Sequence, residues 1–223
     1  MHIPDGFIDL PTSAAFAGAS ALAVAGAVKG ARRQLSEQSA PLAGLTAVFI
    51  FAVQMLNFPV AAGTSGHLLG AALAMVLVGP YAATLALVVV LIIQAFLFAD
   101  GGLTALGLNI FNMGVIGVWV SFVLFMFLKK IFPKTKSWLV IASFISALIS
   151  VPAAAVGFVI EYAIGANATF SVGTVLNAMV GTHILIGIGE AIITALTVSA
   201  VLASRSDLVF GWDNKSTKLE IRS

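Results

Sequence analysis

The chain has 223 residues, of which 11 are Lys or Arg and 9 are Asp or Glu, so charged residues make up only 9%, against about 25% in an ordinary soluble domain. Hydrophobic residues reach 60% and the mean hydropathy is +1.10, a composition whose surface only lipid tolerates. A soluble globular fold is therefore excluded, and the sequence predicts an all-α, polytopic membrane protein. Cysteine is absent, so disulfides and thiolate metal sites are excluded and any metal site must use nitrogen or oxygen.

Seven apolar runs without Lys or Arg follow one another along the chain, and we predict a membrane helix for each. They cover about residues 12–28, 41–58, 66–79, 81–98, 104–128, 137–164 and 172–204. The breaks carry turn or charge signals, among them Gly79-Pro80, Asp100-Gly101-Gly102 and the basic stretch 129–136. We therefore expect one transmembrane domain over residues 1–204, followed by a polar cytoplasmic C-terminal tail over residues 205–223.

The third run is short for a membrane crossing. A helix over residues 66–79 would rise only about 21 Å, less than the hydrocarbon thickness of about 30 Å. We expect the preceding stretch, residues 57–66, to enter the bundle from the outer side, because irregular backbone is tolerated at membrane depth where protein covers it. His67 would then lie below the outer surface.

The basic residues predict the orientation of the helices. All 11 Lys and Arg fall within three regions, at 29–33, 129–136 and 205–222. With seven spans these regions share one side, which the positive-inside rule makes cytoplasmic. The N-terminus is then outside and the C-terminus inside. No cleavable signal peptide is expected, because the first eleven residues lack a basic region and carry Asp5 and Asp9.

The histidines are the candidate metal ligands, and only His2, His67 and His183 occur. The α-amine of Met1, the backbone nitrogen of His2 and its ring Nδ1 can close two fused chelate rings on one ion. This requires loss of the amide proton and suits Ni(II) or Cu(II) in a square plane, with Co(II) a further candidate. His67 is the expected fourth nitrogen donor. The alternatives are a frayed terminus for His2 and a hydrogen-bonded core histidine for His67.

The residues around these histidines favour insertion of the N-terminus into the bundle. Pro4 stiffens the chain, Gly6 permits a bend, and Phe7 and Ile8 are apolar enough to enter the protein interior. The run Gly63-Thr64-Ser65-Gly66 leaves room beside the following imidazole. Several polar side chains within or at the ends of the spans could orient metal-bound histidines or hold the N-terminal segment, or simply join helices. They are Gln54, Asn57, Gln94, Asp100, Asn109, Asn112 and Asn177.

Two further patterns remain open at this stage. His183 and Glu190 are seven positions apart on the last span and share a face, where they could serve metal binding, packing or coupling to a partner. Ala15, Ala19, Ala23 and Ala27 form a small-residue stripe on the first span. Such a stripe allows close approach of another helix, from this bundle or from another subunit.

Three motifs together resemble a known family. They are Met1 to Phe7 (MHIPDGF), Gly63 to Gly70 (GTSGHLLG), and Asp100 to Gly107 (DGGLTALG) followed by Asn109 and Asn112. The chain resembles the NikM/CbiM family, the substrate-binding S components of energy-coupling factor (ECF) transporters for nickel and cobalt, over residues 1 to about 204. The resemblance implies seven helices, an N-terminal loop inserted in the bundle, and metal bound through Met1, His2 and His67, all three of which are intact. The Pro-Asp opening is more similar to the nickel members.

The resemblance also implies the function and the partners. The chain would be a high-affinity Ni(II)- or Co(II)-binding subunit of an ATP-driven importer in a prokaryotic plasma membrane, capturing its transported metal from the outer face in a square-planar four-nitrogen site. Its partners would be a transmembrane T component, two ATP-binding-cassette ATPases and often a small accessory membrane protein, with no nucleic acid. No Gly-x-x-x-x-Gly-Lys-Ser/Thr loop occurs, so we expect no nucleotide site and no enzymatic activity on this chain.

An intramembrane protease and a secondary metal permease are the two alternatives to this function. Gly63-Thr64-Ser65-Gly66 is similar to the Gly-x-Ser-Gly motif of rhomboid intramembrane proteases, in which Ser65 and His183 would form a dyad. That function leaves the Met1-His2 opening unexplained. The second rival is a self-sufficient secondary metal permease. Permeases of that class carry a His-x-x-x-x-Asp-His signature, which is absent from this sequence.

Overall fold

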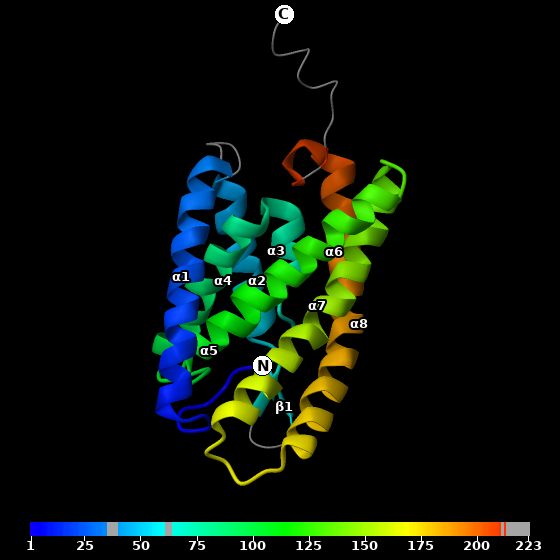
Figure 1. Cartoon of the computed structure of the whole chain (residues 1–223). Coiled ribbons are helices and arrows are strands. Elements are labelled where there is room, and N and C mark those ends of the chain that lie inside the picture. The colour runs from blue at the N-terminus through cyan, green and yellow to red at the C-terminus, as the bar shows by residue number, and fades with distance from the viewer. Residues whose placement is uncertain (35–39, 61–63, 211, 213–223) are drawn as a thin grey trace, which may run out of the picture.

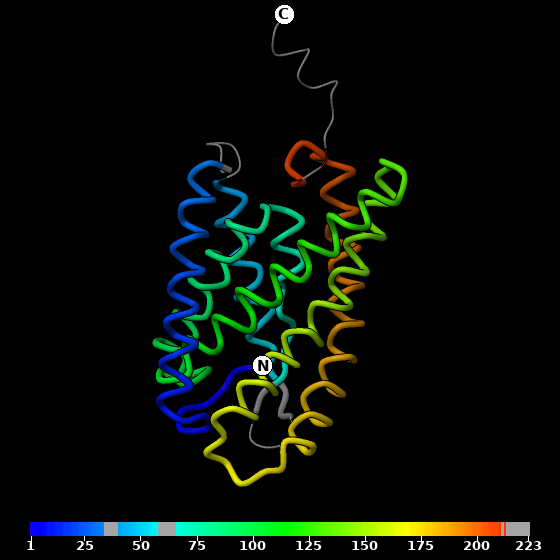
Figure 2. Tube along the Cα trace, viewed as in Figure 1, coloured from blue at the N-terminus to red at the C-terminus, as the bar shows by residue number. Residues whose placement is uncertain are grey.

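The computed structural model describes residues 1–34, 40–60, 64–210 and 212. In this part of the chain the helices stand roughly side by side as one bundle (Figures 1 and 2). They are α1 (Leu10–Gln34), α2 (Ala40–Gln54), α3 (Ala71–Val78), α4 (Pro80–Leu97), α5 (Leu106–Asn109), the π-helix η2 (Ile110–Gly117), α6 (Val118–Ile131), α7 (Lys136–Gly165) and α8 (Val172–Ser204).

The all-α membrane fold predicted from the sequence is confirmed. Each of the seven predicted runs contains a helix, with α5, η2 and α6 continuing one another through the fifth run. The helix ends follow local chemistry. Asp9 caps α1, because its Oδ1 accepts the N–H of Thr12 at 2.8 Å. The break between α3 and α4 falls at the predicted turn, with Gly79 at φ 80° and Pro80 as the first residue of α4.

The structure differs from the prediction around residue 60. The second run was predicted to remain helical to residue 58, but α2 ends at Gln54. A short antiparallel hairpin of β1 (Phe58–Val60) and β2 (Thr64–Gly66) follows. The third helix begins at Ala71 rather than at residue 66. Pro59 lies in β1, and a proline disfavours helical conformation at the residue before it, which here is Phe58.

Five helical segments are long and apolar enough to cross a membrane: Leu10–Arg33, Pro80–Leu97, Leu106–Ile131, Lys136–Gly165 and Val172–Ser204. The apolar helix Ala40–Gln54 is shorter. Helix α3 has 8 residues, all of them buried, and rises about 12 Å. Residues 67–70, which precede α3 without regular structure, are largely buried as well. Protein therefore covers irregular backbone at residues 67–70, which were predicted to be helical, and crossing by α2 and α3 stays a prediction.

The basic residues that the structure describes lie at one end of the bundle. Figure 1 shows the C-terminal ends of α1, α6 and α8 at this end, whereas the connection between α7 and α8 lies at the other end. Lys29, Lys129 and Arg205 therefore share one end, as the topology requires. Of the predicted basic tail, Lys215, Lys218 and Arg222 lie outside the described residues. Which end faces the cytoplasm stays a prediction.

The chain folds back on the bundle after α8. The 3-10 turn η3 (Ser206–Leu208) follows the helix, and the N–H of Phe210 donates to the carbonyl of Leu77 at 3.2 Å. Val209 is 3% exposed. The first residues of the predicted tail thus pack against the membrane domain, and residues 211 and 213–223 lie outside the described part.

Helix α1 contacts the bundle through only part of its surface. Ser20 Oγ donates to the carbonyl of Gly107 at 2.7 Å, and a Cβ on Gly107 would collide with the backbone of Ala17. The predicted alanine stripe does not form one contact face, because Ala27 is buried whereas Ala15 is exposed. Only 17% of the most apolar window of α1 is buried. Most of this helix therefore faces lipid or another protein.

Candidate metal-binding site

The N-terminal segment lies inside the bundle, as the sequence predicts (Figure 1). Met1 and Ile3 are fully buried, and His2 is 4% exposed. A frayed terminus is therefore excluded for His2.

The first anchor of this segment is the loop that follows α4. The N–H of Ile3 donates to Asn109 Oδ1 at 2.8 Å, and its carbonyl accepts the N–H of Gly102 at 2.8 Å. Asp5 Oδ1 accepts both the N–H and the hydroxyl of Thr104, at 2.7 and 2.6 Å. These hydrogen bonds lower the pKa of Asp5. A Cβ on Gly102 would overlap the backbone of Asp5, so only glycine allows this approach.

The second anchor lies at the end of α7. The ring of Phe7 packs against Phe158 and Tyr162, with centroid distances of 5.9 and 5.2 Å. The carbonyl of Phe7 accepts the N–H of Asn167 at 3.1 Å, and the N–H of Asp9 donates to the carbonyl of Gly165 at 2.8 Å. The segment is thus held at residues 3–5 and again at residues 7–9, and its first residues lie buried in the bundle.

The imidazoles of His2 and His67 lie against each other. Their ring centroids are 4.5 Å apart and their planes are inclined by 30°. His67 is fully buried; its Nδ1 lies 2.8 Å from the carbonyl of Leu68, to which only an N–H can donate. Its Nε2 has no hydrogen-bond partner among the described residues. The assigned tautomer therefore presents a lone pair on Nε2.

The ring of His2 is held by two side chains. Its Nε2 lies 3.2 Å from Gln94 Oε1, and the neutral tautomer that donates to Gln94 carries its lone pair on Nδ1. Asp100 Oδ1 lies 3.0 Å from Nδ1, and Asp100 is itself held through Oδ2, which accepts from Asn57 Nδ2 at 2.6 Å. A cation on Nδ1 would therefore meet a carboxylate already in place.

Burial favours neutral donors in the N-terminal segment. Loss of hydration lowers the pKa of the Met1 amine to about 4, although the charge of Asp100 acts in the opposite direction. Burial likewise lowers the pKa of His2, partly offset by the neighbouring carboxylate of Asp100, which favours the protonated ring. Both groups are thus neutral near pH 7, the form in which nitrogen binds a metal.

A chain of buried hydrogen bonds joins His2 to the segment that carries His67. Gln94 Nε2 donates to Gln54 Oε1 at 3.0 Å, and Gln54 Nε2 donates to the carbonyl of Leu69 at 2.6 Å. On the other side, the Glu190 carboxylate accepts the N–H of Leu69 at 2.6 Å and that of Gly70 at 3.1 Å. Helices α2, α4 and α8 thereby fix the two histidines relative to each other.

The sequence identified these polar residues but not their partners. Glu190 was considered with His183, yet in the structure it contacts the backbone of residues 69 and 70. His183 Nδ1 lies 2.7 Å from the carbonyl of Met179 in its own helix, and its Nε2 has no partner among the described residues. The side chain of Ser65 lies outside the described part, so a Ser65–His183 dyad is not tested.

Side chains alone do not make a metal site in the described part of the chain, where no group of three or more His, Cys, Asp or Glu is placed to hold an ion. The histidine pair, with the buried amine of residue 1 entering beside it, is instead the arrangement expected if main-chain nitrogens complete the site.

Comparison with known proteins identifies the family of this chain. Residues 2–208 match the family model CbiM, described as the cobalt uptake substrate-specific transmembrane region. The chain belongs to the CbiM/NikM family. Within it, the chain is 38% identical to a putative metal transport protein of Haloquadratum walsbyi, over 94% of both chains. It is 39% identical to a putative fused nickel transport protein, NikMN, of Archaeoglobus fulgidus, over 94% of this chain and 68% of that protein.

A solved structure supports the same relationship. It is described as a transition metal transporter, and it matches this chain with a TM-score of 0.86 and 29% identity, over 100% of this chain and 99% of the other. Family membership makes this chain a membrane component of nickel and cobalt transport.

Proposed function

We propose that this chain is the substrate-binding S component of an ATP-driven ECF importer, and that it binds Ni(II), with Co(II) as the second substrate, with high affinity. Four nitrogens form a square plane: the amine of Met1, the deprotonated backbone nitrogen of His2, His2 Nδ1 and His67 Nε2. The observation that carries the proposal is the buried contact between His2 and His67, made beside the buried chain terminus.

The tautomers support this ligand set. His67 Nδ1 donates to its neighbour's carbonyl, which leaves Nε2 for the metal. His2 Nε2 donates to Gln94, which leaves Nδ1. In His67 the nitrogen needed for coordination carries an available lone pair, and in His2 the metal would take the place of the present contact between Nδ1 and Asp100 Oδ1.

Charge balance supports a divalent ion at this position. A buried cation is costly unless nearby charge compensates it. The two positive charges of Ni(II) are offset by the deprotonated amide of His2 and by Asp100, whose Oδ1 lies 3.0 Å from His2 Nδ1. The loaded site is then close to neutral, although protein surrounds it on all sides.

The nitrogen donors determine both which metals bind and how binding depends on pH. A square plane of nitrogen donors that includes a deprotonated amide suits Ni(II), Cu(II) and, less strongly, Co(II). Among these metals we favour nickel, because the Archaeoglobus relative is described as a nickel transport protein. Protons compete with the metal for these nitrogens, so affinity falls as the pH is lowered.

Energy and release come from other subunits in this proposal. The described chain folds as one membrane domain, the sequence contains no nucleotide-binding loop, and the fused Archaeoglobus relative is longer than this chain. We assign a T component and two ATPases as partners in a prokaryotic plasma membrane, with an accessory membrane subunit. The exposed side of α1 is a candidate surface for the T component. The metal enters from the end opposite to the basic residues.

The decisive experiment changes only the position of the first amino group. One alanine is added before Met1 in the purified full chain, and nickel binding is measured by calorimetry and by the visible absorption of square-planar Ni(II). Binding should weaken by about a hundredfold or more, because the amine is displaced and a chelate ring is lost. One alanine added after the last residue is the matched control and should change nothing. Equal binding by both extended chains would show that the ligand set is wrong.

Two histidine variants identify the fourth donor. His67→Ala should abolish the square-planar absorption, whereas His183→Ala should retain it, since His183 is assigned no metal bond. X-ray absorption of the nickel-loaded protein should report nitrogen ligands only. If His183→Ala abolished the absorption and His67→Ala retained it, the fourth ligand would be His183 in α8 and not His67.

A further inference from the structure

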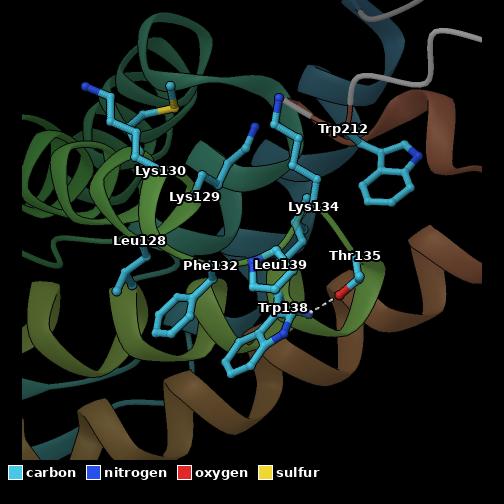
Figure 3. Close-up of a pocket in the computed structure, with 11 residues that line it drawn as sticks. Leu128, Lys129, Lys130, Phe132, Lys134, Thr135, Trp138, Leu139 and Trp212 are labelled. Atoms are coloured by element: carbon cyan, nitrogen blue, oxygen red, sulfur yellow. Dashed lines mark hydrogen bonds between the residues drawn. The ribbon is translucent and has the colours of Figure 1, made fainter.

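A pocket lies at the end of the bundle opposite to the candidate metal site. It is formed by the end of α6, the turn at residues 132–135, the start of α7 and Trp212 (Figure 3). Its volume is about 410 Å³, which falls within the range of about 300–1,000 Å³ typical of small-molecule sites. Neither the metal site nor its hydrogen-bond chain uses any residue of this pocket.

One side of the pocket is apolar and well ordered by contacts. The rings of Phe132 and Trp138 are stacked, with centroids 4.4 Å apart and planes inclined by 2°. Lys136 holds the residues next to these rings in place. Its Nζ donates to the carbonyl of Leu202 at 2.7 Å and lies 5.9 Å from the ring of Trp212. The start of α7 is thereby tied to the end of α8.

The charge of the pocket is of one sign. Lys129, Lys130 and Lys134 line it, and among the residues that line it the structure describes no Asp or Glu. Figure 3 shows the ends of the three lysine side chains on the side of the pocket away from the stacked rings of Phe132 and Trp138. Three positive charges over an aromatic floor form a site for an anion that also carries an apolar part.

We propose that this pocket binds the headgroup of an anionic phospholipid. Lys130 and Lys134 bind the phosphate, and the stacked rings of Phe132 and Trp138 contact the glycerol and the first carbons of the acyl chains. Basic pockets between transmembrane helices on the cytoplasmic side favour anionic headgroups, and tryptophan is enriched at this depth of the bilayer.

The surroundings favour a lipid over a free phosphate. Large apolar side chains next to the pocket in sequence are exposed on α6 and α7, with Phe127 57%, Ile131 59% and Ile141 40% exposed. Acyl chains can lie along these helices while the headgroup remains among the lysines. A soluble phosphate would use the lysines but would gain nothing from this apolar surface.

The test compares two pairs of basic residues at the same end of the molecule. Lys130→Gln with Lys134→Gln removes two charges from the pocket. Lys29→Gln with Arg33→Gln is the matched control, because it removes two charges from a separate basic pocket formed by α1 and Tyr81. Each full-length chain is purified in detergent and titrated with phosphatidylglycerol or phosphatidylcholine, and bound lipid is measured by native mass spectrometry.

The unsubstituted chain should bind phosphatidylglycerol in preference to phosphatidylcholine. The Lys130/Lys134 pair should weaken this binding about thirtyfold, which corresponds to about 2 kcal/mol at about 1 kcal/mol per lysine. The control pair should change it by less than threefold. Phosphatidylglycerol brominated near the headgroup should quench the tryptophan fluorescence of the control pair but not that of the pocket pair. Nickel binding should be unchanged in both pairs, which separates this test from that of the proposed metal site.

Three results would overturn the proposal. Equal loss of lipid in both pairs would indicate general attraction of charge to the membrane. Binding of inorganic phosphate or glycerol phosphate with the same dependence on Lys130 and Lys134, together with no preference among lipids, would identify a soluble anion. Loss of association with the other transporter subunits, with lipid binding intact, would identify the pocket as a protein contact.

Discussion

The carboxylate of Asp100 is the residue-scale feature that distinguishes the candidate site from an ordinary pair of core histidines. Its Oδ1 lies 3.0 Å from His2 Nδ1, and its Oδ2 accepts from Asn57. Two neutral histidines can be buried without a nearby carboxylate, whereas a buried divalent cation needs negative charge to compensate it. Asp100 therefore gives the site a charge preference that the nitrogen donors lack.

We expect Asp100→Asn to weaken nickel binding by about ten- to a hundredfold, as removal of groups around metal ligands usually does. The amide keeps the size of the side chain but removes its charge, so the fold should be retained. Calorimetric titration with Ni(II) measures the change, with Asp207→Asn as the control. Asp207 is an exposed carboxylate that pairs with Arg205 and touches none of the proposed donors. Unchanged affinity in Asp100→Asn would remove the carboxylate from the charge balance.

The residues of the site could be predicted from the sequence to different degrees. Met1 and His2 were identifiable because adjacency in the chain alone defines a chelate. His67 was identifiable from its glycine-rich flank and predicted side of the membrane. The partners of Gln94 and Glu190 could not be predicted, because each contact joins segments at least 40 positions apart and depends on how α2, α4 and α8 pack.

At the scale of elements, the loop between α4 and α5 holds the N-terminal segment in place. The closest approach is at Gly102, whose N–H donates to the carbonyl of Ile3 at 2.8 Å. Backbone atoms of Pro4 and Asp5 fill the space that a Cβ on Gly102 would need. The N-terminal segment cannot move away from this loop easily, because it is anchored on both sides of the contact.

Gly102→Ala should therefore displace the N-terminal segment and weaken nickel binding by about tenfold or more, since loss of the contacts that hold metal ligands in place costs about 10–100-fold in affinity. Gly26→Ala is the matched control, because a Cβ there meets nothing within 4 Å. Both variants should retain their helical circular dichroism. If Gly102→Ala bound nickel as tightly as Gly26→Ala, the loop would not be the support that the contacts indicate.

Helix α8 acts on the site through Glu190. Its carboxylate accepts the N–H groups of Leu69 and Gly70, which lie two and three residues after His67. A shift of α8 is therefore transmitted to a proposed metal ligand. This connection offers one route by which movement of the bundle could loosen the metal.

A graded series tests this connection. Glu190→Gln keeps one acceptor oxygen, but its amide N–H₂ faces an N–H, whereas Glu190→Leu removes both acceptors. Nickel binding should weaken in the order Glu, Gln, Leu, by up to about a hundredfold. Glu161→Gln is the control, since that buried carboxylate is bonded to Asn112 and not to the histidine segment. Equal effects of Glu190→Gln and Glu161→Gln would indicate a general cost of altering buried acids.

At the scale of the whole molecule, the sequence was sufficient for the helical framework because each apolar run is bounded by charge, proline or glycine. It was insufficient between α2 and α3. Periodicity cannot distinguish a buried helix from extended chain over a short apolar run, so the predicted run 41–58 extends beyond α2, which ends at Gln54, and the run 66–79 begins before α3, which starts at Ala71. The eight residues of α3 contact protein on all sides, and their burial follows only from the complete bundle.

The basic residues predict which end of the bundle faces the cytoplasm. Because the chain has no cysteine, this orientation can be measured by labelling introduced thiols. Thr169 lies in the connection between α7 and α8, and Ser137 lies in the first turn of α7 at the basic end; both are exposed. Thr169→Cys and Ser137→Cys each introduce the only thiol of the chain. The two positions are separated by the length of α7, about 45 Å for 30 residues.

Intact cells are treated with a membrane-impermeant maleimide, and permeabilised cells serve as the control. Thr169→Cys should be labelled in both, and Ser137→Cys only after permeabilisation, because a basic end retained in the cytoplasm leaves the entrance to the N-terminal segment outside. The reverse pattern would place the candidate site toward the cytoplasm. Capture of scarce metal from outside the cell would then be incompatible with this bundle, however well the four nitrogens bound nickel.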